Sequence, residues 1–125
     1  MSQRKYAKFI SWSRAHALAI SSAFVLAIPT VSGAAEAWLT ATITAVYPQS
    51  DGGVALTFSA SSPFCTNVSD PKYHYLYVGY NSVTQPGFKN LLAVVMLAFS
   101  TGKVVAVNFD DSTPNCFINR IYLGS

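Results

Sequence analysis

Charged residues are scarce in this sequence, and so are the side chains that carry acid–base chemistry. Lysine, arginine, aspartate and glutamate make up 10% of the 125 residues, with two histidines and two cysteines. Hydrolytic and acid–base catalysis need titratable groups that converge on one place. We therefore expect no catalytic site, no bound metal and no cofactor, and we expect that the protein is not an enzyme.

The few remaining candidates for chemistry have simpler explanations. His74 has no carboxylate close to it in sequence, which favours a structural role. Asp110 and Asp111 belong to the turn-rich segment DDSTPN, where aspartate side chains commonly bond the backbone. Their spacing does not match a calcium-binding loop. Gly52-Gly53 is typical of a hairpin turn rather than of a phosphate-binding loop.

The first 37 residues have the pattern of an export signal. A positively charged stretch that contains Arg4, Lys5, Lys8 and Arg14 precedes an apolar segment at 15–28. Small residues then lead to Ala35-Glu36-Ala37, an A-x-A cleavage pattern. The apolar run is shorter than the ~20 residues of a membrane span. The sequence predicts a signal peptide at 1–37, a domain at 38–125 with no stable membrane anchor, and a secreted or periplasmic location. Cleavage after Ala34 or Ala35 is the alternative.

Removal of this signal changes the charge of the protein. The whole chain has a formal net charge of +3. In residues 38–125 the cations Lys72, Lys89, Lys103 and Arg120 are balanced by Asp51, Asp70, Asp110 and Asp111. A neutral domain has no field that attracts phosphates, so nucleic acid is not an expected partner.

Both cysteines lie in the predicted domain, which is small enough to benefit from a covalent link. In an oxidising compartment we expect a disulfide between Cys65 and Cys116. Closing a loop of about 50 residues contributes roughly 4 kcal/mol in the chain-entropy model. Free buried thiols and a metal site are alternatives, but two cysteines with one histidine make a poor zinc site.

Hydrophobic patterning predicts five strands and one helix. Period-two alternation indicates strands at 39–47, 54–60, 73–80, 103–109 and 116–123. On the first strand, Leu39, Ala41, Ile43, Ala45 and Tyr47 share one side. The apolar segment 86–101 favours a helix capped by Thr84 and ended by Gly102. The order β-β-β-α-β-β predicts an α+β, mostly β fold. It is a five-stranded, partly open OB-like barrel with the helix between strands three and four. A small α+β sandwich is the alternative.

The predicted helix is apolar nearly all round. Its inner face would include Phe88, Leu91, Leu92, Val95, Ala98 and Phe99, whereas Val94 and Leu97 lie off that face. Such a helix is usually buried on more than one side. We therefore expect Val94 and Leu97 to contribute to contacts in a homo-oligomer.

Tyrosines concentrate on the third predicted strand. Alternation places Tyr73, Tyr75 and Tyr77 on one side, and His74 and Tyr80 on the other. A tyrosine ring offers a flat apolar face and a hydroxyl, which suits a sugar or a protein partner. Tyr73, Tyr75 and Tyr77 are therefore candidate ligand-binding residues, although core filling explains the same pattern.

Part of the chain resembles known toxin subunits. The segment 88–109, FKNLLAVVMLAFSTGKVVAVNF, looks like the helix and following strand of the B subunits of subtilase cytotoxin and typhoid toxin. Shared features are the Leu-Leu pair, the Phe99–Gly102 turn and the valine-rich strand, together with Trp38 and Ile43-Thr44. Small secreted bacterial proteins with the same core are also similar. The resemblance implies an OB fold, a bacterial secreted or periplasmic protein, and an AB5-type ring of five subunits.

These observations predict a non-enzymatic exported binding module. It would be toxin B-subunit-like, bind a glycan or a protein partner, and associate through its helix into a pentamer-like assembly. The alternative is a monomeric structural or interaction domain of the cell envelope with no small ligand.

Overall fold

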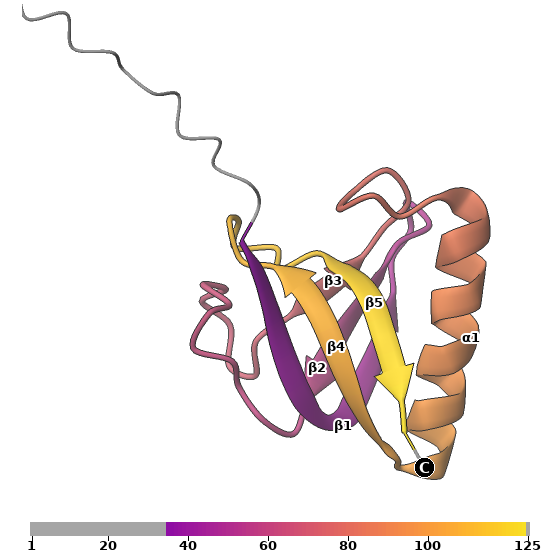
Figure 1. Cartoon of the computed structure of the whole chain (residues 1–125), viewed down its shortest axis with the longest axis horizontal. Coiled ribbons are helices and arrows are strands. Elements are labelled where there is room, and N and C mark those ends of the chain that lie inside the picture. Colours follow the sequence, from indigo (N-terminus) through magenta and orange to yellow (C-terminus); the bar gives the residue numbers. More distant parts are fainter. Residues whose placement is uncertain (1–34, 125) are drawn as a thin grey trace, which may run out of the picture. The chain divides into compact units, whose positions relative to one another are not determined.

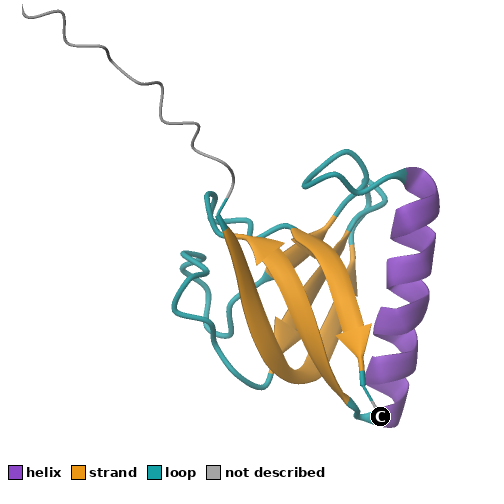
Figure 2. Ribbon diagram, in the orientation of Figure 1, coloured by secondary structure: helices purple, strands orange, loops and turns teal. Residues whose placement is uncertain are grey.

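The computed structural model describes residues 35–124, and the predicted signal peptide lies almost entirely outside them. The elements are β1 (Glu36–Pro48), β2 (Val54–Phe58), β3 (His74–Leu76), α1 (Gln85–Thr101), β4 (Val104–Asp110) and β5 (Ile118–Leu123). The strands form one antiparallel sheet in the order β3-β2-β1-β4-β5, with α1 along one side (Figures 1 and 2). β1 already includes the two residues before Trp38, where the predicted domain starts.

β1 is long because its two halves pair with different strands. Residues 36–42 pair with β4, whereas residues 43–48 pair with β2. The register shifts between Ile43 and Ala45, so Thr44 is an extra residue and the strand bulges there. The bulge exchanges the two sides of the strand. Val46 therefore packs against the core, and Tyr47 is 43% exposed. The prediction that Tyr47 shares the inner side with Leu39 was wrong.

The α+β, mostly β class is confirmed, but the predicted partly open barrel is not, because the five strands form an open sheet. β3 and β5 are the two edges of the sheet. They approach each other where the Tyr75 N–H donates to the Asn115 carbonyl over 3.2 Å, just before β5. The helix packs against β1 and β5 at the side of the open sheet, a different placement from a helix closing a barrel. The third strand is also shorter than predicted, because the chain turns at Gly79, with φ of 84°.

The helix prediction at 86–101 is confirmed to within a residue. The Thr84 side chain accepts the Gly87 N–H over 3.2 Å, and Gly102 adopts the left-handed conformation with φ of 65°. Phe88, Val95 and Ala98 are buried against the sheet. Phe99 was predicted on the inner face but is 41% exposed. A narrower strip of the helix is therefore covered than the pattern predicted.

His74 lies in the core, as its sequence context favoured. Its ring is 1% exposed and meets Phe58 and Phe109 edge to face, with centroids 5.1 and 4.8 Å away. Among the described residues, neither ring nitrogen has a hydrogen bond of normal geometry. Burial penalises the charged imidazolium and lowers the pKa of His74 to about 4, an effect that the Lys72 backbone opposes only in part.

Stability should therefore fall in mild acid. The unfolded chain binds a proton at His74 near pH 6.5, whereas the folded chain binds it near pH 4. The free energy of unfolding should drop as the pH falls between these values, by roughly 3 kcal/mol in total. Urea unfolding at pH 7.5 and 4.5 measures this drop. His74→Phe should show a smaller one, and an equal drop in both proteins would contradict the assignment.

Candidate functional site

The three predicted tyrosines lie side by side on β3 and the residues around it. The ring centroids of Tyr73 and Tyr75 are 6.3 Å apart, and those of Tyr75 and Tyr77 are 6.2 Å apart. Tyr47 continues the row at one end, with its ring edge-on to Tyr73 at 5.6 Å. All three predicted rings are half-buried, whereas the alternating residues His74 and Leu76 are buried in the core. The tyrosine side of β3 is therefore a surface.

Two further aromatic residues extend the row at its other end. The rings of Tyr80 and Phe117 stack with centroids 4.5 Å apart and planes 20° from parallel. Tyr77 stands nearly perpendicular to both, at 6.1 and 6.3 Å. Strand alternation had placed Tyr80 with His74, and the turn at Gly79 overturns that prediction. Phe117 comes from the segment before β5, and no local pattern signals this contact.

A pocket of about 470 Å³ is lined by four of these rings, those of Tyr75, Tyr77, Tyr80 and Phe117, whereas Tyr73 is not among its lining residues. Its lining consists of Asp51, Tyr75, Tyr77, Val78, Tyr80, Asn115 and Phe117. The volume lies within the range of small-molecule sites, which combine mostly apolar walls with a few polar groups. A hollow of about 540 Å³ over β4 and β5 is larger, but Tyr122 is its one aromatic residue and Gly124, the last described residue, forms its rim. The aromatic pocket is therefore the candidate site.

Asp51 and Tyr77 form one end of the pocket. In the turn between β1 and β2, Asp51 Oδ1 accepts the Gly53 N–H over 3.3 Å, which orients the carboxylate. The phenol end of Tyr77 packs directly over Gly53, where a Cβ atom would collide with it. Burial, followed by the hydrogen bond and negative charge of Asp51, raises the pKa of Tyr77. Tyr77 therefore stays a neutral phenol at physiological pH.

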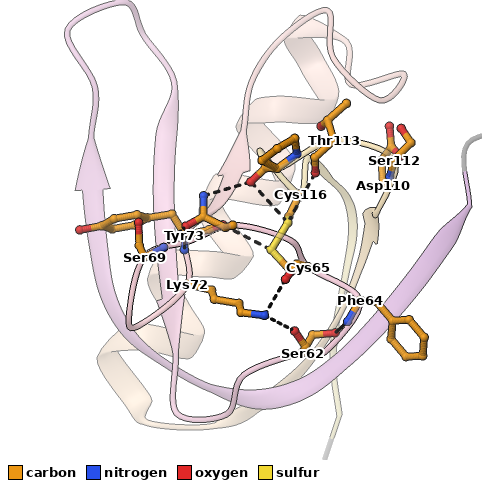
Figure 3. The surroundings of a disulfide bond; sticks show 12 residues. Ser62, Phe64, Cys65, Ser69, Lys72, Tyr73, Asp110, Ser112, Thr113 and Cys116 are labelled. Carbon is orange, nitrogen blue, oxygen red and sulfur yellow. Dashed lines mark hydrogen bonds between the residues drawn. A yellow bond between two sulfur atoms is a disulfide. The ribbon is translucent and has the colours of Figure 1, made fainter.

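The predicted disulfide between Cys65 and Cys116 is confirmed, and it holds the other end of the pocket. The two Cα atoms are 5.7 Å apart, and both cysteines are fully buried. Cys116 lies between the two lining residues Asn115 and Phe117. On the opposite segment, Lys72 Nζ donates to the carbonyls of Ser62 and Cys65 over 3.0 and 2.6 Å (Figure 3). The disulfide thus fixes the turn that carries Asn115 and Phe117.

A second set of bonds joins the same two segments. Asn67 Nδ2 donates to the Pro114 carbonyl over 3.0 Å, and Asn67 Oδ1 accepts the N–H groups of Ser69 and Tyr73. The amide of Asn67 is therefore engaged within the chain, although Asn67-Val68-Ser69 matches a glycosylation sequon.

The predicted oligomer residues lie away from this pocket, on α1. Val94 is half-buried and Leu97 is 53% exposed, and their spacing of three residues places them on one side of the helix, whereas the exposed Met96 lies on another side. Neither Val94 nor Leu97 lines the aromatic pocket. The structure thus presents two separate surfaces, an aromatic pocket and an apolar helix strip.

Metal ligation and membrane insertion find no support within residues 35–124. No three histidine, cysteine or acidic side chains in this part of the chain gather closely enough to hold an ion. The helix in this part lacks the length and apolar character needed to cross a membrane.

Comparison with known proteins supports the fold. No protein-family model matches the chain, and no curated protein sequence matches it either. Among solved structures, it is similar to human heat-labile enterotoxin in complex with a blood group A antigen analog. The TM-score is 0.54 and the identity 10%, over 72% of this chain and 86% of that one. The expected likeness to toxin B subunits, which are binding rather than catalytic modules, is therefore shown for the fold.

The packing of Tyr77 over Gly53 yields a direct test of the pocket geometry. Gly53→Ala should displace the Tyr77 ring and lower the free energy of unfolding by about 1–3 kcal/mol, as overpacking does. Urea unfolding measures the loss, and near-ultraviolet circular dichroism reports the displaced tyrosine. Ser50→Ala in the same exposed turn is the matched control. Unchanged stability and spectrum in Gly53→Ala would contradict the described packing.

Proposed function

We propose that this protein is a non-enzymatic exported binding module that recognises a glycan through the aromatic pocket. The observation that carries the proposal is the pocket itself, in which Tyr75, Tyr77, Tyr80 and Phe117 surround a space bordered by Asp51 and Asn115. Sugar rings combine an apolar face with polar hydroxyl groups. Aromatic rings beside polar lining groups match both features. The toxin B-subunit-like fold supports a binding role.

A glycan fits these observations better than the two alternatives. In a structural domain without a ligand, tyrosines would serve mainly to fill the core. Here the core is already filled by residues such as His74 and Leu76, and the half-buried tyrosine row lies outside it beside a preformed pocket. A protein partner typically covers about 800 Å² on each side. The stacked and perpendicular rings instead line an open hollow of small-molecule volume.

Export is part of the same proposal. The buried disulfide and the toxin B-subunit-like fold fit an extracellular or periplasmic protein. A signal peptide at 1–37 would deliver the chain there. Cleavage after Ala37 would make Trp38, the third residue of β1, the first residue of the mature chain.

We further propose that the module assembles into a pentamer-like homo-oligomer through α1. Val94 and Leu97, three residues apart, form an apolar strip on one side of a helix whose single charged residue is Lys89. An apolar surface of this kind is a common feature of subunit contacts. In a closed ring the strip would pack against a different surface of the neighbouring subunit. Several copies would then present several glycan pockets, which raises avidity.

Removing a pocket ring should weaken glycan binding without unfolding the protein. Tyr80 is 52% exposed, so Tyr80→Ala should leave the protein folded and lower the melting temperature by only a few degrees as the stack on Phe117 is lost. Loss of its stacked face should lower the affinity for any glycan found on an array by roughly tenfold. Tyr122→Ala, on β5 outside the pocket, is the control. A folded protein that binds none of the arrayed glycans would refute the proposed function.

The helix strip is tested by the oligomeric state. Light scattering of the exported protein should show an assembly larger than a monomer, and Leu97→Lys should dissociate it, because a buried unpaired ammonium is strongly disfavoured. Met96→Lys adds the same charge at a position of α1 that is 48% exposed but lies on another side of the helix, and it should leave the assembly intact. A monomer at high concentration would rule out the ring.

A further inference from the structure

We infer that the aromatic pocket selects sugars that carry no negative charge, with the Asp51 carboxylate as the residue that rejects sialylated and sulfated glycans. The inference rests on the proposed glycan-binding function, and it adds the chemical class of the ligand.

The charge of the pocket is the first argument. Of the residues that line it, Asp51 carries a negative charge and the others are neutral. A lysine or arginine that could pair with a sugar carboxylate or sulfate is missing from this lining. Lys72 is committed to the Ser62 and Cys65 carbonyls, and Lys103 borders the separate hollow over β4 and β5. An anionic sugar in the pocket would therefore leave its charge unpaired.

The hydrogen-bonding capacity of the rim is the second argument. Asp51 Oδ1 accepts the Gly53 N–H, and the carboxylate also takes part in a hydrogen bond with Tyr77. A carboxylate offers about four acceptor sites, so capacity remains for a sugar hydroxyl. An ionised carboxylate accepts hydrogen bonds but cannot donate them, and its bonds to hydroxyl groups are the stronger, charge-assisted kind. Asn115 adds an amide that both donates and accepts. Sugar hydroxyls can satisfy this arrangement, whereas a sugar carboxylate offers Asp51 only further lone pairs.

The behaviour of Tyr77 agrees with this picture. Its pKa is raised by burial and by Asp51, which means that a negative charge on the phenol is disfavoured at this place. The same field acts on any anion that docks against Tyr77. Two like charges about 6 Å apart lower the affinity between about threefold and about a hundredfold, depending on how far solvent screens them. Discrimination of roughly tenfold is the expected result.

The experiment compares matched glycans on the exported protein with its disulfide intact. An array would carry each neutral oligosaccharide beside its sialylated and sulfated counterparts. The affinities of the best pair would then be measured in solution. We expect the neutral member to bind at least about tenfold more tightly. Asp51→Asn keeps an oxygen for the Gly53 N–H but removes the charge, so it should narrow this ratio markedly. Ser50→Ala in the same turn should leave the ratio unchanged.

The outcomes distinguish the proposed glycan binding from the inferred preference for neutral sugars. If the folded protein binds no glycan, the proposed function fails and the inference fails with it. If anionic glycans bind as tightly as neutral ones, or more tightly, the inference alone is overturned. If the neutral preference is present but unchanged in Asp51→Asn, the role assigned to Asp51 is wrong.

Discussion

The bulge at Thr44 in β1 is the feature on which the rest of the fold depends. The strand pairs with β4 before it and with β2 after it, so one strand belongs to both halves of the sheet. A hydrogen bond of 2.9 Å joins the Thr44 and Thr57 hydroxyls at this point. Because a bulge bends a strand and increases its twist, the two halves curve toward each other. This curvature brings β3 close to the segment that precedes β5.

The pocket exists because of that approach. Its walls come from three places distant in sequence, namely the turn after β1, the residues of β3 with the turn that follows, and the segment before β5. The Tyr75 N–H and the Asn115 carbonyl form a direct backbone bond between two of them. The stack of the Tyr80 ring on the Phe117 ring adds a side-chain contact between the turn that follows β3 and the segment before β5. Each contribution is modest, but together they hold rings from separate segments in one arrangement.

The features that sequence could predict are local ones. Thr84 and Gly102 mark the ends of α1 through short-range capping chemistry, and alternation correctly placed Tyr73, Tyr75 and Tyr77 side by side. The disulfide is the exception, because it joins residues 51 positions apart but two cysteines allow only one pairing. Other long-range features escaped prediction. The bulge at Thr44 depends on pairing with β2, and the partnership of Tyr80 with Phe117 depends on how far the sheet curls. Asp51 and Asn115 lie in turns, where polar residues usually have only local roles.

Cys116 stands between Asn115 and Phe117, and its partner Cys65 belongs to a loop that hydrogen bonds alone would hold less firmly. In a reducing cytoplasm the two thiols would remain separate, and the wall that carries Phe117 would lose its covalent tether. Newly made chains would then have an incomplete pocket. Completion of the pocket would therefore be tied to the compartment in which the disulfide forms.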